Sequence, residues 1–156
     1  FDTAMLEMLD PAGQGISELV VTTLTNDFMP LIRYRIGDLV ERHERPYYTS
    51  YAVHGRAADA FCAADGRCVT VAQIDQCLAD LPGFAHYQLT EREAGAYLLR
   101  FVPDCAAPAT AAIEELRQRL GRLLGIRNGP AVQRTDLLMP ESSGKFRLGY
   151  PAGKLA

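Results

Sequence analysis

The sequence predicts an α+β fold in two parts, a short β-rich unit over residues 1–54 and a larger mixed domain over residues 55–156. Runs of β-branched and apolar residues between turn-forming clusters fill most of the first part and are typical of strands. From about residue 66 onward the pattern alternates as strand, helix, strand, strand, helix, strand. That order is typical of a ferredoxin-like (βαββαβ) domain, in which two helices cover one face of an antiparallel sheet.

The β-rich part contains two segments with a strand pattern. Residues 16–24 (ISELVVTTL) predict one strand, because they are mostly β-branched or apolar. Residues 31–41 (LIRYRIGDLVE) predict two more strands joined by a tight turn at Gly37 and Asp38, and residues 42–53 predict a loose connection. Because so short a unit cannot bury a core of its own, we expect it to pack on a part of the protein outside this sequence.

Two segments of the larger part carry the apolar period of a helix. Residues 70–81 predict the first helix, and Thr70 with Gln73 predicts a capping box, because the hydroxyl and the amide can each satisfy a backbone group at the helix start. Residues 110–124 predict the second helix, with glutamates early and arginines late, as the helix dipole favours. Gly125 is a natural end for this helix.

The strands of the larger part are predicted by short runs bounded by turn residues. Residues 63–71 (AADGRCVTV) predict a hairpin with an Asp-Gly turn. Residues 84–91 and 96–102 predict the strands of a second hairpin, and residues 131–138 predict a last strand. Together with the two helices, these segments give the βαββαβ order.

Composition and charge argue against several classes of partner. The net charge of −3 and the pI of about 5.6 argue against nucleic acid and anionic membranes, which usually bind basic faces. No apolar run approaches the length of a membrane span. An RNA-binding module of this topology would carry stacking aromatics beside basic residues, whereas Tyr87, Tyr97 and Phe101 have little positive charge nearby. We expect these three aromatic residues to pack in or on the sheet.

The four cysteines do not predict a metal site. Cys62, Cys68, Cys77 and Cys105 form no C-x-x-C pair and have no histidine cluster beside them. Two disulfides are formally possible, but ordinary thiols in a reducing cytoplasm are the expectation. The chain starts with Phe1 rather than Met and shows no signal peptide, so we expect a processed, truncated or excised piece of a protein.

Three polar residues are candidates for a functional site. Asp38 and Arg56 each follow a glycine, and Lys145 follows Ser-Ser-Gly a few residues from the end of the chain. Taken singly, each has a common structural explanation: a turn aspartate, a solvated arginine and a surface lysine. A lysine that must reach into a site on another domain would also suit such a glycine-containing turn.

The order of these stretches resembles the adenylate-forming enzymes, the acyl- and aryl-CoA ligases and their relatives. Five stretches carry the resemblance over nearly the whole chain: SELVVTTL, MPLIRYRIGDL, GRAAD, DGRCVTVAQIDQCL and SSGKFRL. The second stretch most resembles the phenylacetate-CoA ligase branch. The resemblance implies an acid–thiol ligase that uses ATP and Mg²⁺ to convert a carboxylic acid to an acyl-adenylate. The acyl group then passes to coenzyme A or to carrier-protein phosphopantetheine.

The resemblance also assigns roles to the three candidates. It implies that Lys145 is the catalytic lysine, that Asp38 binds the ribose hydroxyls and that Arg56 lies near the nucleotide. These residue types suit the chemistry, because a cation offsets the negative charge that builds up when a carboxylate attacks the α-phosphate. A carboxylate can accept two hydroxyl hydrogen bonds, as a ribose requires.

By the same resemblance, residues 1–54 end the large ATP- and acid-binding domain and residues 55–156 form a small mobile lid. The phosphate-gripping loop, the acid pocket and most Mg²⁺ contacts would belong to a missing N-terminal domain, so we expect little catalysis from this chain alone. The family's hinge is usually an acidic residue or a lysine, but Ala58 stands at that position here, with Asp59 next. Either Asp59 serves as the hinge or the domain rotation is altered.

Two further departures and two alternative interpretations remain. Ile36 replaces a common threonine of the family, and Ser17 replaces a common glycine.

One alternative is a stand-alone ferredoxin-like binding or regulatory module, whose three candidate residues would not converge on one cleft. The other is a degenerate relative without catalysis, kept for interaction, in which Ala58 and Ile36 mark drift.

Overall fold

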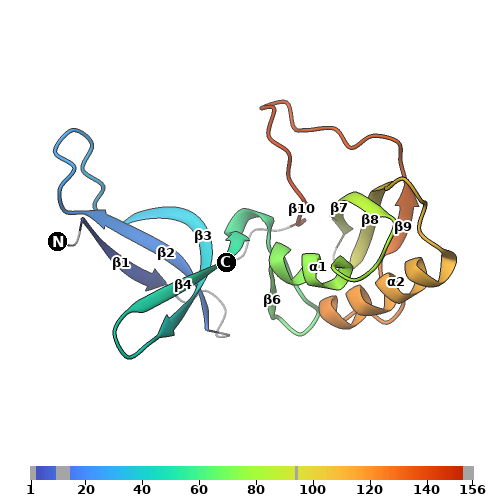
Figure 1. The fold of residues 1–156 in the computed structure, drawn as a ribbon, viewed down its shortest axis with the longest axis horizontal. Helices are drawn as coiled ribbons and strands as arrows, with labels where there is room; N and C mark the ends of the chain where they lie inside the picture. The colour runs from blue at the N-terminus through green and yellow to red at the C-terminus, as the bar shows by residue number, and fades with distance from the viewer. Residues whose placement is uncertain (1–2, 10–14, 94, 153–156) are drawn as a thin grey trace.

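The computed structural model describes residues 3–9, 15–93 and 95–152, which form two lobes side by side along the long axis of the molecule (Figure 1). The first lobe is a sheet of strands alone, and the second contains both α-helices and two further sheets. The fold is therefore α+β, as the sequence predicts. Neither helix in the described part of the chain is long and apolar enough to cross a bilayer.

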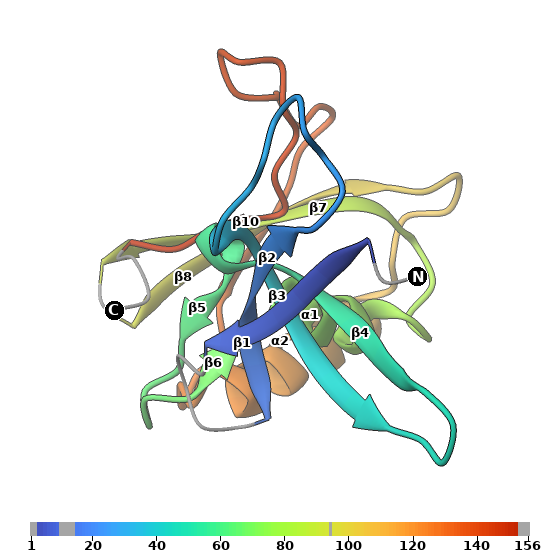
Figure 2. The same cartoon turned by 90° about the vertical axis from the view of Figure 1, so that its left-hand side faces the viewer.

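The first lobe is a four-stranded antiparallel sheet in the order β1-β2-β3-β4. Its strands are β1 (Ala4–Leu9), β2 (Ile16–Thr23), β3 (Tyr34–Glu44) and β4 (Thr49–Arg56). Strand β2 confirms the strand predicted over residues 16–24. The sheet is strongly twisted (Figure 2). Its last strand, β4, runs antiparallel to β3 and ends at Arg56, directly before the second lobe.

Two sequence predictions for this lobe are wrong. Gly37 and Asp38 do not form a turn between two strands but lie inside the single long strand β3. The alternation is broken there because the strand bulges, and a bulge disturbs the same pattern that a turn does. The loose connection predicted over residues 42–53 is mostly strand: β3 continues to Glu44 and β4 starts at Thr49.

The second lobe begins with a short 3₁₀ turn and contains the remaining elements. In chain order they are η1 (Ala57–Asp59), β5 (Phe61–Cys62), β6 (Cys68–Val69), α1 (Val71–Leu78), β7 (Phe84–Glu93), β8 (Ala96–Pro103), α2 (Thr110–Leu124), β9 (Ala131–Arg134) and β10 (Gly149–Tyr150). Strands β5 and β6 form the predicted hairpin. The main sheet has the order β10-β7-β8-β9, with β7 and β8 antiparallel and each edge strand parallel to its neighbour.

The predicted order β-α-β-β-α-β is present as β6, α1, β7, β8, α2 and β9, but the ferredoxin-like arrangement is not confirmed. Strand β6 pairs only with β5, in a separate two-stranded sheet. It is two residues long, because Thr70 directly after it caps α1. The edge of β7 is instead occupied by β10, a strand that the sequence analysis does not predict.

Helix boundaries follow the capping residues. Thr70 accepts a hydrogen bond from the Gln73 backbone N–H (3.4 Å), and the Gln73 side chain accepts one from the Thr70 N–H (2.9 Å), which confirms the capping box. Helix α1 ends at Leu78, earlier than predicted. Helix α2 spans the predicted residues and ends at Leu124, and Gly125 directly after it caps the helix with a left-handed φ of 71°.

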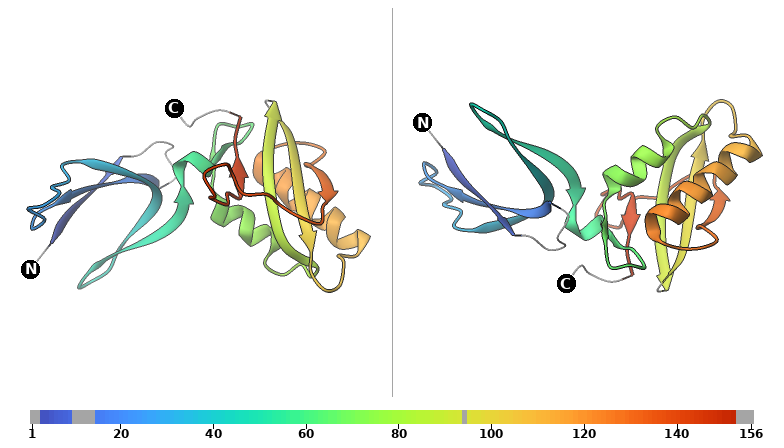
Figure 3. Two further views of the ribbon diagram at one scale, coloured as in Figure 1. Left: turned by 90° about the horizontal axis from the view of Figure 1, so that it is seen from above. Right: turned by 90° about the horizontal axis from the view of Figure 1, so that it is seen from below.

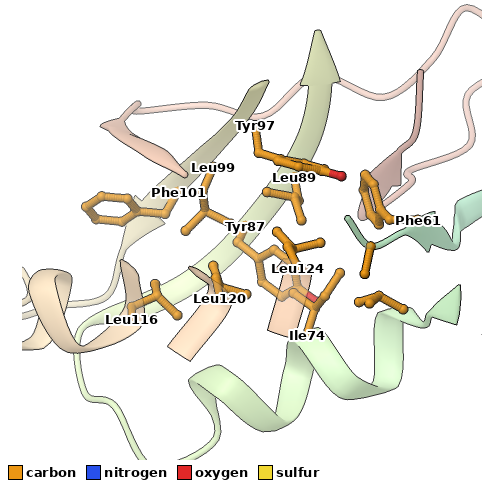
Figure 4. Close-up of a cluster of buried hydrophobic side chains, with 12 residues drawn as sticks. Phe61, Ile74, Tyr87, Leu89, Tyr97, Leu99, Phe101, Leu116, Leu120 and Leu124 are labelled. Carbon is orange, nitrogen blue, oxygen red and sulfur yellow. The ribbon is translucent and has the colours of Figure 1, made fainter. Parts of the chain in front are cut away.

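Both helices cover one face of the main sheet, and the core lies between these layers (Figures 3 and 4). Helix α2 contributes three fully buried leucines, Leu116, Leu120 and Leu124. They pack in one cluster with Ile74 of α1 and with apolar residues of β7 and β8. Tyr87, Tyr97 and Phe101 belong to this cluster, as expected from the lack of positive charge near them.

The opposite face of the sheet is crossed by residues 135–148, which connect β9 at one edge to β10 at the other (Figure 3). Gln88 of β7 lies on this face, because its neighbours point into the core, and its side-chain amide donates to the backbone oxygen of Arg147 (3.3 Å). Leu138 of the crossing segment is buried. The segment therefore covers part of the face that the helices leave open.

The two lobes share a small apolar junction beside η1. Ile16 and Leu39 of the first sheet cluster with Ala60 and Cys68 of the second lobe. Strand β4 also approaches α1, since a Cβ on Gly55 would lie 3.6 Å from the Cβ of Val71. The boundary predicted between residues 54 and 55 stays a prediction; β4 ends at Arg56 and η1 follows directly.

We predict that Leu120→Ala lowers the free energy of unfolding by about 2–5 kcal/mol, because it leaves a cavity under a side chain that is fully buried between α2 and the sheet. Urea denaturation followed by circular dichroism measures the change. Gln118→Ala, at an exposed position of the same helix, is the control and should stay within about 0.5 kcal/mol of the wild type. Equal losses in both variants would contradict this account of the core.

Candidate functional site

Asp38 and Arg56 face each other across the β3–β4 pair at the end of the first lobe. They are register partners, and Arg56 Nε lies 3.0 Å from Asp38 Oδ1. The Asp38 side chain is 29% exposed and that of Arg56 is 62% exposed, so a ligand can reach both. The structure thus brings these two predicted site residues together in one accessible ion pair.

Two bulges shape this end of the β3–β4 pair. The residues at 36–38 of β3 interrupt its pairing with β2, and Gly37 there has a φ of +82°. This conformation turns the backbone oxygen of Ile36 toward Arg56, whose Nη1 donates to it (2.8 Å). A second register shift lies between Val53 and Gly55 of β4, and Gly55 has a φ of +108°. Bulges re-aim side chains, and here they set Arg56 beside Asp38.

The departure at Ile36 does not affect these contacts. Ile36 takes part through its backbone oxygen, which any residue at that position would provide. Ser17, the other departure, is buried in β2 opposite Val40, and within the described residues no hydrogen bond joins its side chain to the Asp38–Arg56 pair. The family's usual residues at these two positions are therefore not needed to form the pair.

Lys145 lies in a tight turn of the crossing segment. The backbone N–H of Glu141 donates to the Lys145 oxygen (2.9 Å), and that of Gly144 donates to the Glu141 oxygen (2.8 Å). The Lys145 N–H donates to Ser143 Oγ (3.4 Å), and Gly144 has a φ of +78°. Lys145 itself is exposed, and within the described residues its ammonium makes no hydrogen bond or ion pair. The turn is ordered by its backbone while the lysine side chain extends into solvent.

The two hinge candidates lie in η1, and the crossing segment binds them through Arg147. Arg147 Nε donates to Asp59 Oδ1 (2.6 Å), and its Nη2 donates to the backbone oxygen of Ala58 (2.6 Å). Sequence reasoning does not single out Arg147, because its partners are 88 and 89 positions away. A local pattern carries no signal for such a contact.

The candidates thus form two groups. Asp38 and Arg56 make one pair, while Ala58 and Asp59 are joined to the segment that carries Lys145. No hydrogen bond or ion pair joins Lys145 to either member of the Asp38–Arg56 pair within residues 3–9, 15–93 and 95–152. In this described part of the chain, no three histidine, cysteine, aspartate or glutamate side chains are placed to hold a metal ion together.

Comparison with known proteins gives a likeness in fold. No protein-family model and no curated protein matches the sequence. Among solved structures, 2-hydroxyisobutyryl-CoA ligase in the postadenylation state with 2-HIB-AMP is similar, with a TM-score of 0.61 and 26% identity over 99% of this chain and 36% of the ligase. Acetoacetyl-CoA synthetase from Streptomyces lividans gives 0.64 and 18% identity over 93% of this chain and 25% of that one. O-succinylbenzoate coenzyme A synthetase from Bacillus subtilis, in complex with AMP, gives 0.61 and 17% over 94% and 34%.

These structure neighbours are CoA ligases, and two of the three hold AMP or an acyl-adenylate. The chain spans about a third of the length of the ligase and of the succinylbenzoate synthetase, and less of the acetoacetyl enzyme. It therefore has the fold of one segment of such enzymes, both lobes included, since the match covers nearly all of it. Membership of the phenylacetate-CoA ligase branch receives no support from these neighbours.

We predict that Gly37→Ala destabilises the first lobe by about 1 kcal/mol and disorders the Asp38–Arg56 pair, because a φ of +82° is unfavourable for a residue with a Cβ. The Arg56 guanidine Nε–H signal, followed by NMR, should lose the shift caused by its bond to Asp38. Gly37→Asn is the matched control, since asparagine tolerates this conformation better, and should lose less on both measures. An alanine variant as stable as the asparagine variant would contradict this role of the bulge.

Proposed function

We propose that this chain is the C-terminal segment of an adenylate-forming acid–thiol ligase. In the first reaction a carboxylate attacks the α-phosphate of ATP, giving an acyl-adenylate and pyrophosphate. In the second, the thiol of coenzyme A or of a carrier protein displaces AMP and takes the acyl group. The observation that carries the proposal is an accessible Asp38–Arg56 pair and a solvent-exposed Lys145 on a fold similar to ligases that bind acyl-adenylates.

The proposed roles come from the resemblance, and the geometry of the pair and the turn is compatible with them. One oxygen of the Asp38 carboxylate pairs with Arg56, and the carboxylate would accept hydrogen bonds from the ribose hydroxyls, while Arg56 would add a cation near the nucleotide. Lys145 is a point charge on a flexible stem and suits the bridge between the acid and the α-phosphate. When bound, ATP supplies the leaving pyrophosphate, with Mg²⁺ held by the rest of the protein.

Exposed apolar residues on the first lobe support the proposal that this chain is part of a larger protein. Phe28, Met29 and Ile32, in the connection between β2 and β3, are exposed large hydrophobic residues. Several such residues together on one loop are typical of a surface that packs against another part of a protein. We propose that residues 1–54 end a large ATP- and acid-binding domain, and that residues 55–156 move against it as a lid about Ala58 or Asp59.

We also propose a ligase branch, a class of acid and an acceptor. The stretch MPLIRYRIGDL supports a ligase of the phenylacetate-CoA type that acts on an aryl or acyl acid. Four free cysteines support a location in the reducing cytoplasm. The acid itself would be selected by a pocket in the N-terminal domain. Carrier-protein phosphopantetheine remains an alternative acceptor to coenzyme A.

In the longer protein, Lys145→Ala should lower the rate of acyl-adenylate formation about 10²–10³-fold while ATP binding is largely kept, because one preorganised charge at the α-phosphate is lost. ATP–pyrophosphate exchange measures the rate, across a panel of aryl and alkyl acids. Arg127→Ala, at an exposed arginine after α2, is the control and should leave the rate unchanged. An unchanged exchange rate in Lys145→Ala would remove Lys145 from the mechanism.

The 156 residues alone should release no measurable pyrophosphate with any acid of that panel, because they lack the phosphate-gripping loop and the acid pocket. The longer protein, which includes the residues encoded upstream of Phe1, should release pyrophosphate. Turnover by the isolated chain would contradict the proposed division of labour. A start codon directly upstream of Phe1, with no longer protein, would instead favour a binding module.

A further inference from the structure

Arg147 binds more partners than any other cation of the crossing segment. Its Nε and Nη2 bond Asp59 Oδ1 and the Ala58 oxygen, and its Nη1 donates to Glu141 Oε1 (3.3 Å). The guanidinium lies over the ring of Tyr150, 5.1 Å from its centroid. All three guanidinium nitrogens are thus used, and only 28% of the side chain is exposed. Such a contact set fixes the orientation of the side chain.

The backbone around Arg147 is also held. Its oxygen accepts from the Gln88 side chain, and the next residue, Leu148, accepts from the backbone N–H of Leu89 (2.8 Å). Gly149 passes so close to η1 that a Cβ there would collide with the backbone oxygen of Asp59. The chain directly after Lys145 is therefore fixed between β7 and η1.

Ion pairs with Asp59 and Glu141 strengthen the attachment of Arg147. Burial opposes the charge of Arg147, but hydrogen bonds and attraction from Asp59 and Glu141 outweigh it and raise the pKa of the guanidinium. The Asp59 side chain is only 16% exposed. Removing Arg147 would leave this carboxylate nearly buried without a cation, which is far more costly than losing an exposed pair.

Arg147 also closes the turn that carries Lys145. Glu141 begins the turn, because its N–H bonds the Lys145 oxygen, and its side chain bonds Arg147. The Arg147 guanidinium thus bonds the first residue of the turn, Glu141, and also bonds η1. Arg147 itself lies two residues after the lysine, so the turn is held on both sides of Lys145. We propose that Arg147 is a positioning residue, a clamp that fixes the Lys145 turn on η1 and so sets where the ammonium can reach. The catalytic part of this inference rests on the proposed function, and the clamp itself does not.

Hydrogen exchange on the full-length protein tests the clamp. Arg147→Ala should speed exchange of the amides in residues 141–145 at least about 10-fold and leave the amides of α2 unchanged. Asp59→Asn should act in the same direction, and the double variant should exceed Arg147→Ala only slightly, because both remove one contact. Arg134→Ala, at an exposed arginine of β9, is the matched control. Exchange at the wild-type rate in Arg147→Ala overturns the clamp.

Steady-state kinetics tests the positioning. Arg147→Ala should lower kcat for adenylation about 10²-fold, as displacement of a catalytic group by about 1 Å can do, and should leave KM for ATP unchanged. Adding it to Lys145→Ala should cause no further loss. Arg147→Lys, which keeps the charge but cannot bond three acceptors at once, should lie between and serves if the alanine variant does not fold. Wild-type kcat with accelerated exchange overturns the positioning role.

The two measurements separate the failure of this inference from that of the proposed function. If the wild-type protein adenylates no acid, the proposed function is wrong, and the exchange result alone decides the clamp. The wild-type protein could instead adenylate an acid while Arg147→Ala slows acyl-adenylate formation and the later transfer to the thiol equally. Arg147 would then be merely structural, and the positioning role would be overturned.

Discussion

The topology of the main sheet is the constraint on which the position of Lys145 depends. Helix α2 returns the chain to β9, on the far side of β8, yet the open edge of the sheet is at β7. The chain must cross the sheet to reach that edge, and the helices already cover one face. Residues 135–148 therefore cross the other face (Figure 3). Lys145 is exposed on a turn of this crossing segment.

The end of the crossing segment is bound at several points. Strand β10 has two residues, too few for a ladder to hold it by itself. The Arg147 contacts to η1 and the bond from Gln88 add the missing attachments. The same contacts attach the second lobe's last segment to the boundary between the lobes, so the Lys145 turn and η1 form one structural unit.

Features set by neighbouring residues could be predicted from the sequence. The bounds of α2 follow from its leucine stripe and Gly125, and the start of α1 from the bond between Thr70 and Gln73. Features set by distant residues could not. The bulge at Gly37 looks like a turn unless the register against β2 is known. Asp38 and Arg56 are candidates by resemblance, but the bond between them depends on the β3–β4 register. No local sequence pattern predicts that Arg147 and Asp59 are partners.

Lys145 and Arg147 differ in ways that match their chemistry, although only one residue separates them. A guanidinium offers a rigid planar fork, and at position 147 it meets three acceptors from η1 and the turn. An ammonium is a compact charge on a flexible stem, and at position 145 it extends from a turn whose backbone bonds are already satisfied. We therefore expect an exchange of the two to lose both proposed roles, because a lysine at 147 cannot bridge three acceptors and an arginine at 145 is too broad to act as a point charge. The order Lys-Phe-Arg therefore places an exposed cation beside the residue that we propose fixes it.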